Sequence, residues 1–197
     1  MIMISQMNVL ALGFLLPIFL QNGVGSSSLT AALILLPGAA ANAVMSLWVG
    51  SLLKKHRATT FFLAGYLLQS VMLIVFLKAA YTVGMVICFY LAFMFGAGLI
   101  VVAAQTNALN RLSAENNADG SAIMNTLQQT GGAIGTALAS SFLTPSVSRA
   151  LSNGLTKEQA YADGLRGSLG FFLGLTIFGL VLALLSRKGK YILGNHE

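Results

Sequence analysis

The segment from Thr82 to Asn110, TVGMVICFYLAFMFGAGLIVVAAQTNALN, contains no Lys, Arg, Asp, Glu or His. A helix needs about 20 apolar residues to cross roughly 30 Å of hydrocarbon, so this segment is long enough to span a bilayer. Other stretches of the chain share its character. Together they predict six transmembrane helices, at residues 4–21, 29–53, 60–77, 82–110, 122–143 and 168–186.

The composition agrees with a membrane protein. Of the 197 residues, 56% are hydrophobic and only 8% are charged, and the mean hydropathy is +0.82. The apolar stretches are too long and continuous for outer-membrane strands, which alternate every second residue over about ten residues. Helices satisfy their own backbone amides in lipid, so we predict an all-α, polytopic fold in a single domain covering residues 1–197.

Few residues in this sequence could carry catalysis or bind a metal. Cys88 is the single cysteine and has no partner for an intrachain disulfide, and His56 and His196 are predicted to be solvated basic neighbours. No predicted span contains a His-Glu-x-x-His motif, paired carboxylates or a Ser/Lys pair. The sequence therefore favours no cofactor or metal, and an intramembrane enzyme is the weakest of the functions considered.

The basic residues predict how the chain is oriented, because Lys and Arg near membrane ends are held on the cytoplasmic side. The first stretch has no Lys or Arg before it, unlike a cleaved signal peptide, and is expected to be retained. One set of helix ends carries Lys54, Lys55, Arg57, Arg111, Arg187, Lys188 and Lys190, and the other carries Lys78, Arg149, Lys157 and Arg166. Both termini are thus predicted to be cytoplasmic. The net charge of +6 then reflects topology and contact with anionic lipid headgroups, rather than nucleic acid binding.

Two connections between the spans have local signals. Residues 144–167 are predicted to form the largest outer loop, in which Thr156-Lys157-Glu158-Gln159 has the form of a capping box. It would open a short amphipathic helix through Ala162 that ends near Gly164 and rests on the headgroups. On the inner side, Asn117 or Asp119 is predicted to cap the fifth span.

Uncharged amides within the spans are the main functional signal. They are costly in lipid unless they pair with neighbouring helices or line a wet cavity. They concentrate in spans one, two, four and five, which are predicted to surround a polar interior while spans three and six face lipid. The candidates for a substrate pathway are Asn8, Asn42, Gln105, Asn107, Asn125, Gln128 and Gln129. The alternative is that these amides only join helices, which is slightly favoured for any single residue.

Small residues and prolines suggest where helices approach or bend. Gly131 with Gly135, and Gly170 with Gly174, have the small-xxx-small spacing of close helix contacts. Prolines remove backbone donors and permit kinks in spans one and two, at Pro17 and Pro37. The distribution of polar spans also divides the chain into two groups of three, as a pair of inverted repeats would.

Three segments resemble a known family: Leu16-Pro17-Ile18-Phe19-Leu20-Gln21-Asn22, Leu35-Leu36-Pro37-Gly38, and the run from Asn117 to Gln129 continuing to Gly135-Thr136-Ala137. They are similar to the C-terminal half of the major facilitator superfamily, specifically to its drug:proton antiporters with about fourteen spans. The resemblance implies a six-helix half-bundle in the inner membrane of a bacterial-type cell. It also implies proton-driven multidrug efflux, with amphipathic or cationic compounds as substrates, and hence antibiotic resistance.

The chain departs from that family in two respects. It lacks the N-terminal bundle, and the segment Gly50-Ser51-Leu52-Leu53-Lys54-Lys55-His56-Arg57 lacks the acidic residue of the family's Gly-x-Leu-x-Asp-Arg pattern. No span holds an Asp, Glu or His that could relay protons. The expected partners are therefore the lipid bilayer, a small-molecule substrate, and an N-terminal six-helix bundle or a second copy. The alternative is a truncated, non-transporting membrane protein or an assembly partner of a full-length pump.

Overall fold

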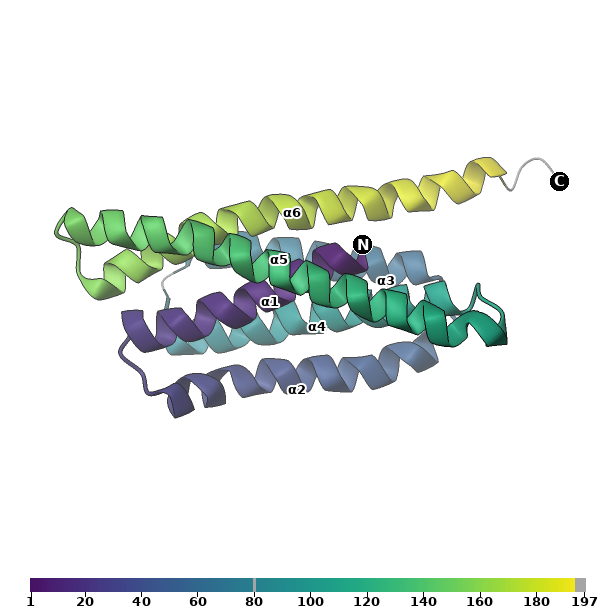
Figure 1. The fold of residues 1–197 in the computed structure, drawn as a ribbon, viewed down its shortest axis with the longest axis horizontal. Coiled ribbons are helices and arrows are strands. Elements are labelled where there is room, and N and C mark those ends of the chain that lie inside the picture. Colours follow the sequence, from purple (N-terminus) through teal and green to yellow (C-terminus); the bar gives the residue numbers. More distant parts are fainter. Residues whose placement is uncertain (80, 194–197) are drawn as a thin grey trace.

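The computed structural model describes residues 1–79 and 81–193, and shows long helices running side by side (Figure 1). Six long helices are present, as predicted, and their bounds differ from the expected spans by a few residues at most ends. The elements are α1 (Ile2–Ile18), the π-helical turn η1 (Phe19–Gly23), α2 (Ser28–Leu52), α3 (Ala58–Lys78), α4 (Val83–Leu109), the 3-10 turn η2 (Ala114–Asn116), α5 (Asn117–Ser152) and α6 (Lys157–Leu193).

Five of the helices are long and apolar enough to cross a membrane by themselves: α1 with η1, α2, α3, α4 and α6. The sixth, α5, has 36 residues and ample length, but its many Thr, Ser, Gln and Gly residues make it less apolar. It nevertheless runs the length of the bundle alongside α1 and α6 (Figure 1). The polar character of α5 therefore calls for neighbours that shield it from lipid.

Four helices form a closed ring around the core of the bundle. Contacts join α1 to α4, α4 to α3, α3 to α6 and α6 back to α1, whereas α1 and α3 face each other across the ring without close backbone contact in the described residues. Outside this ring, α2 packs mainly on α4, and α5 packs on α1 and α6. The ring corrects the prediction that spans three and six only face lipid, because α3 and α6 each bury one face in it.

Large apolar side chains fill the half of the ring nearer η1. Leu12 and Leu15 of α1, Phe76 of α3 and Phe172 of α6 are at most 1% exposed. The ring of Phe76 stacks on that of Phe89 in α4, with centroids 4.0 Å apart. In contrast, α3 and α6 turn an apolar face outward, including Leu67, Ile74, Phe178 and Leu185. These outward faces suit contact with lipid tails.

The outer loop is much shorter than predicted. The short surface helix expected up to Gly164 is wrong, because α6 begins at Lys157 and continues without interruption to Leu193. Gly164 lies against α5: a Cβ at this position would be 2.9 Å from side-chain atoms of Leu143 and of Val147. Packing of α6 on the extended end of α5 therefore keeps the helix intact where the sequence alone suggested a stop.

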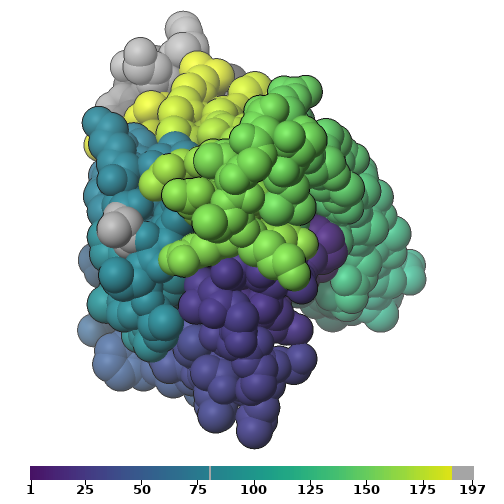
Figure 2. Space-filling model, turned by 90° about the vertical axis from the view of Figure 1, so that its left-hand side faces the viewer, coloured from purple at the N-terminus to yellow at the C-terminus, as the bar shows by residue number. Residues whose placement is uncertain are grey.

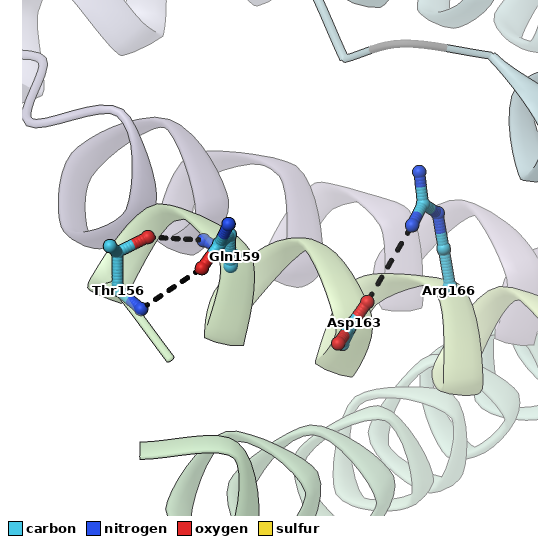
Figure 3. Close-up of polar contacts among 4 residues, drawn as sticks. All are labelled: Thr156, Gln159, Asp163 and Arg166. Atoms are coloured by element: carbon cyan, nitrogen blue, oxygen red, sulfur yellow. Dashed lines mark hydrogen bonds and ion pairs between the residues drawn. The ribbon is translucent and has the colours of Figure 1, made fainter. Parts of the chain in front are cut away.

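The predicted capping box does form, at the start of α6 itself (Figure 3). The backbone N–H of Gln159 donates to the Thr156 hydroxyl at 3.3 Å, and the backbone N–H of Thr156 donates to Gln159 Oε1 at 3.2 Å. At the other end of the bundle, the predicted caps at Asn117 and Asp119 are wrong. There α5 already begins at Asn117, and the preceding residue, Asn116, makes no side-chain capping bond to it.

The two prolines predicted to permit kinks have different surroundings. Pro17 is followed within two residues by the π-helical turn η1, in which the N–H of Val24 donates to the carbonyl of Phe19. Pro37 lies in the middle of α2, which continues as an α-helix on both sides. Irregular helix geometry therefore follows the first proline and not the second.

The connections place the predicted basic clusters at one end of the bundle. The α2–α3 and α4–α5 connections, with Lys54, Lys55, Arg57 and Arg111, lie at the end toward which α6 runs (Figure 1). The opposite end carries η1, the α3–α4 connection and the turn between α5 and α6. His196, part of the predicted cytoplasmic tail, lies outside the described residues.

Candidate functional site

An open side of the bundle lies between α2 and α5. These two helices make no close contact with each other in the described residues, and α1 and α4 lie behind the gap. In Figure 2 the α2 segment at the bottom and the green α5 segment at the right stand apart, with the purple N-terminal segment between them. Only 22% of the most apolar window of α2 is buried, against 56% in α4. We call this side the open face.

Two of the predicted pathway amides lie where α4 meets α2. Asn42 of α2 is half-buried, and its Nδ2 donates to the Met94 sulfur at 3.7 Å. Gly98 of α4 also faces α2, since a Cβ there would lie 3.0 Å from Met45 Cβ. Gln105 follows Gly98 by seven residues, which puts it on the same side of α4. Asn42 and Gln105 thus share the α2–α4 contact beside the open face.

Asn107 points elsewhere. It shares a helical face with Gly96 and Ile100, which contact α3: a Cβ at Gly96 would be 3.0 Å from the Gly65 carbonyl oxygen, and a Cβ at Gly65 would be 2.6 Å from Ile100 Cγ1. Asn107 is two positions beyond Gln105, which is roughly 200° of rotation in an α-helix. The two amides therefore cannot line one surface.

The predicted polar stripe on α5 is accessible. Asn125 and Gln129 are exposed, and Gln128 is half-buried, with its Nε2 donating to the Met124 carbonyl at 3.4 Å. The stripe lies near the start of α5. Because Gly131 lies opposite Met3 near the start of α1, the residues before Gly131 extend beyond the first residue of α1. The three amides make no hydrogen bond to another helix within the described chain.

Asn8 differs from the other candidates because it is fully buried. It lies on the face of α1 that points into the ring, away from α5. The structure therefore distributes the seven candidate amides over the ring, the α2–α4 contact, the α3 side of α4 and the start of α5, and does not gather them in one cavity of this chain. Gln69 is also completely buried, but it was not among the predicted candidates because its span was expected to face lipid.

The small-residue motifs have unequal surroundings. Gly131 and Gly135 lie directly on the backbone of α1: a Cβ at Gly131 would be 2.8 Å from the Met3 carbonyl oxygen, and one at Gly135 would be 2.7 Å from Met7 Cα. Gly170 and Gly174 have nothing within 4 Å of a Cβ position in the described structure. The first pair holds two helices of this chain together, and the second pair faces outward.

A pocket of about 520 Å³ lies between η1, the α3–α4 connection and the start of α6. Asp163 and Arg166 form an ion pair at 3.5 Å beside it (Figure 3). The Arg166 guanidinium carbon lies 5.1 Å from the centroid of the Tyr81 ring, which packs edge-on against Phe19. Burial raises the pKa of the Tyr81 phenol, and the charge of Arg166 partly lowers this pKa again. This aromatic and charged cluster was not predicted, since its members come from separate segments of the sequence.

Six long helices, a ring-shaped core and an open face define a polytopic α-helical membrane protein built as a single bundle. A model of the Major Facilitator Superfamily matches residues 1–136. The chain therefore belongs to the Major Facilitator Superfamily, a family of transporters rather than enzymes, and the resemblance seen in the sequence is confirmed.

Curated relatives agree with this assignment. "Lincomycin resistance protein LmrB" of Listeria monocytogenes is 34% identical over 199 residues, which cover 96% of this chain and 42% of the relative. The Bacillus subtilis protein of the same name is 33% identical over 198 residues, covering 96% and 41%. The "Uncharacterized MFS-type transporter YhcA" of Bacillus subtilis is 37% identical over 135 residues. The chain spans about two fifths of the length of the LmrB relatives.

Proposed function

We propose that the chain is the C-terminal half of a proton-driven multidrug efflux transporter. The observation that carries this proposal is the open face: α2 contacts little besides α4, and the accessible amides of α5 make no hydrogen bond to another helix in the described chain. In a transporter of this kind, two bundles rock against each other around a midplane site. The open face would then be the surface that the other bundle covers.

The second bundle is proposed to be an N-terminal set of six helices, or else a second copy. LmrB relatives are long enough to contain such a bundle, because this chain covers only 42% of the Listeria monocytogenes protein. The residues available at the open face are uncharged, including Asn42, Gln105 and Gln129. Amides of this kind suit amphipathic or cationic compounds whose polar groups they can hydrogen-bond, and lincomycin is the first compound to test, given the names of the relatives.

Proton coupling is proposed to depend on the other bundle. Among the described residues, the acidic side chains are Glu115, Asp119, Glu158 and Asp163, and none lies in the middle of a helix that crosses the bundle. A proton relay through a membrane generally uses Asp, Glu or His. We also propose that both termini are cytoplasmic, which the shared basic end of the bundle supports.

The test is to express residues 1–197 alone and together with the N-terminal bundle of an LmrB relative, in cells without other drug pumps. We expect no efflux from the chain alone. With the added bundle we expect lincomycin resistance that disappears when the proton gradient is dissipated. Efflux by the chain alone would instead identify a working homodimer. A complete lack of efflux when both parts are inserted would favour the non-transporting alternative.

A matched pair of variants tests the open face within the assembled pump. Gln129→Leu should leave membrane abundance near normal while changing which of several unrelated compounds are exported. The control is Gly174→Ala, an outward position with open space around it, which should change neither property. If the Gln129→Leu variant is less abundant in the membrane, and resistance to every compound falls in proportion to that lower abundance, the pathway assignment is wrong.

A further inference from the structure

The inner half of the ring contains polar side chains that no protein group satisfies. Ser5, Asn8 and Gln69 are each 0% exposed. Five of their atoms have no hydrogen-bond partner in the described structure: Ser5 Oγ, Asn8 Oδ1 and Nδ2, and Gln69 Oε1 and Nε2. A buried polar group left unpaired costs about 1–3 kcal/mol, so a folded protein is expected to provide a partner.

The side chains from α1 point toward α3. Met1, Ser5, Asn8 and Leu12 follow one another at intervals of three and four residues, which places them on one face of α1. The Met1 carbonyl accepts a hydrogen bond from the Tyr66 hydroxyl of α3 at 2.7 Å. Leu12 on this face belongs to one buried apolar cluster with Leu73 of α3, so the face that carries Ser5 and Asn8 looks across the ring.

Gln69 occupies the matching face of α3. It follows Tyr66 by three residues and precedes the fully buried Leu73 by four. Its Cγ lies 3.1 Å from where a Cβ of Gly96 in α4 would be, so the absence of a side chain at Gly96 leaves room for Gln69. Gln69 thus enters the ring beside α4.

The three residues lie between two levels at which α1 and α3 are linked. The helices α1 and α3 run parallel, and at the first level the Tyr66 hydroxyl bonds to the Met1 carbonyl. At the second level, toward η1, the ring of Tyr81 packs on the rings of Phe19 and Phe76, with centroid distances of 5.4 and 4.9 Å. Gln69 lies about one turn outward of Tyr66, while Ser5 and Asn8 lie about one and two turns outward of Met1. All three lie between these levels and on the side of the Tyr66–Met1 bond, and we call this group the core polar layer.

Neighbouring hydroxyls do not serve these amides. Ser70 of α3 donates to the Tyr66 carbonyl at 2.8 Å, and Thr176 of α6 donates to the Phe172 carbonyl at 2.7 Å, so each hydroxyl proton is used within its own helix. Because α1 and α3 make no close backbone contact, the amides approach from opposite sides of the ring. A small ligand between them would satisfy both.

The geometry points to an internal water-binding site in the core polar layer, held by Ser5, Asn8 and Gln69. Two carboxamides and a hydroxyl offer both donors and acceptors, which is the mixture that water, itself donor and acceptor, can satisfy. A cation would find no negative charge here and would face two amide NH₂ groups, which disfavours it. The site is enclosed by α1, α3, α4 and α6, and is therefore separate from the open face proposed for substrate.

Radiolytic labelling tests this site directly, because X-rays generate hydroxyl radicals from water bound inside a protein, and these radicals oxidise adjacent buried side chains. The probe is applied to the 197-residue chain in lipid nanodiscs, and each labelling rate is divided by the rate for the same residue in the unfolded chain. Tyr66 is 0% exposed and Phe172 is 1% exposed, so bulk solvent reaches neither. We expect Tyr66 to be labelled severalfold faster than Phe172. Equal, slow labelling of both residues would show a dry layer and overturn the proposal.

Variants provide a second measurement. The double variant Asn8→Leu/Gln69→Leu should reduce the Tyr66 rate to that of Phe172, since the groups that hold water are gone. The control Thr176→Val, which removes a buried hydroxyl already bonded within α6, should leave the Tyr66 rate high. A Tyr66 rate that stays high in a folded double variant would place the water elsewhere and overturn the assignment to these residues. If the double variant does not fold, the comparison of Tyr66 with Phe172 in the unmodified chain still decides the question.

Discussion

The α1–α5 contact and the α2–α4 contact are equivalent in an inverted repeat of three helices, yet they are built differently. At the first, Gly131 and Gly135 lie on the backbone of α1, at Met3 and Met7. At the second, Gly38 of α2 lies on the side chain of Tyr90. The aromatic side chain of a tyrosine can rotate about its torsions, whereas a helix backbone can move only as a whole. Similar glycine contacts should therefore differ in how well they tolerate an added methyl group.

Gly135→Ala should have the largest effect. Its Cβ would overlap the Met7 carbonyl and would lie 2.7 Å from Met7 Cα, so α5 must shift away from α1. We expect a loss of about 3 kcal/mol of stability, the upper end of ordinary overpacking, measured as thermal unfolding of the purified chain in detergent. Gly174→Ala is the control and should be close to neutral. An unchanged unfolding temperature for Gly135→Ala would show that the α1–α5 contact is not rigid.

Gly38→Ala should cost less, about 1 kcal/mol, because the obstacle is largely the Tyr90 ring. A second substitution, at Tyr90, tests whether the ring is the obstacle. In a Tyr90→Ala background the penalty of Gly38→Ala should shrink, measured by a double-mutant cycle on unfolding temperatures. A penalty that is unchanged by removal of the ring would mean that the Tyr90 backbone, and not its side chain, limits the approach of α2.

Thr156→Ala removes the capping bond at the start of α6, away from both glycine contacts. We expect a loss of about 1 kcal/mol, and Thr156→Ser should recover most of it, since Ser presents the same hydroxyl. The loss should add to that of Gly135→Ala, because the two sites share no partner. Strong non-additivity would instead show that the α1–α5 contact is energetically coupled to the start of α6.

The smallest expected effect is at the end of the bundle that carries η1. There α1 continues into η1 beside Tyr81, whereas α4, the counterpart of α1 in the repeat, has no such extension. Burial already holds the pKa of Tyr81 above its usual range, and Arg166→Gln should raise this pKa further by removing a nearby positive charge. Because the folded state disfavours the phenolate, Tyr81 should contribute less stability as the pH rises above the ordinary tyrosine pKa of about 10, and the loss should be steeper in the variant. The check is a spectrophotometric titration, with Tyr81→Phe subtracted to isolate this phenol. A lower Tyr81 pKa in the variant would contradict the role given to Arg166.

Much of the architecture followed from the sequence because hydrophobic length and local hydrogen bonding are local properties. Apolar runs of membrane length predicted six long helices, and Thr156 with Gln159 predicted a helix start that the structure confirms. The glycine spacing at 131 and 135 predicted a close helix contact, which the structure places on α1. Family membership was also visible in the run from Asn117 to Gln129, and residues 1–136 match the family.

Tertiary structure decided how long α5 and α6 are and where the buried amides point. A helix can continue past the apolar core when another helix packs on it. At Gly164, α5 packs on α6 in this way, and a hydropathy pattern contains no such contact. Gln69 was assigned to a lipid-facing span, yet lies fully buried in the ring, while Asn125 and Gln129 remain exposed. The helical period groups residues of one helix on a common face, but the direction of that face depends on which helices become neighbours. That choice is made by packing between segments far apart in the chain, and so it appears only in the assembled bundle.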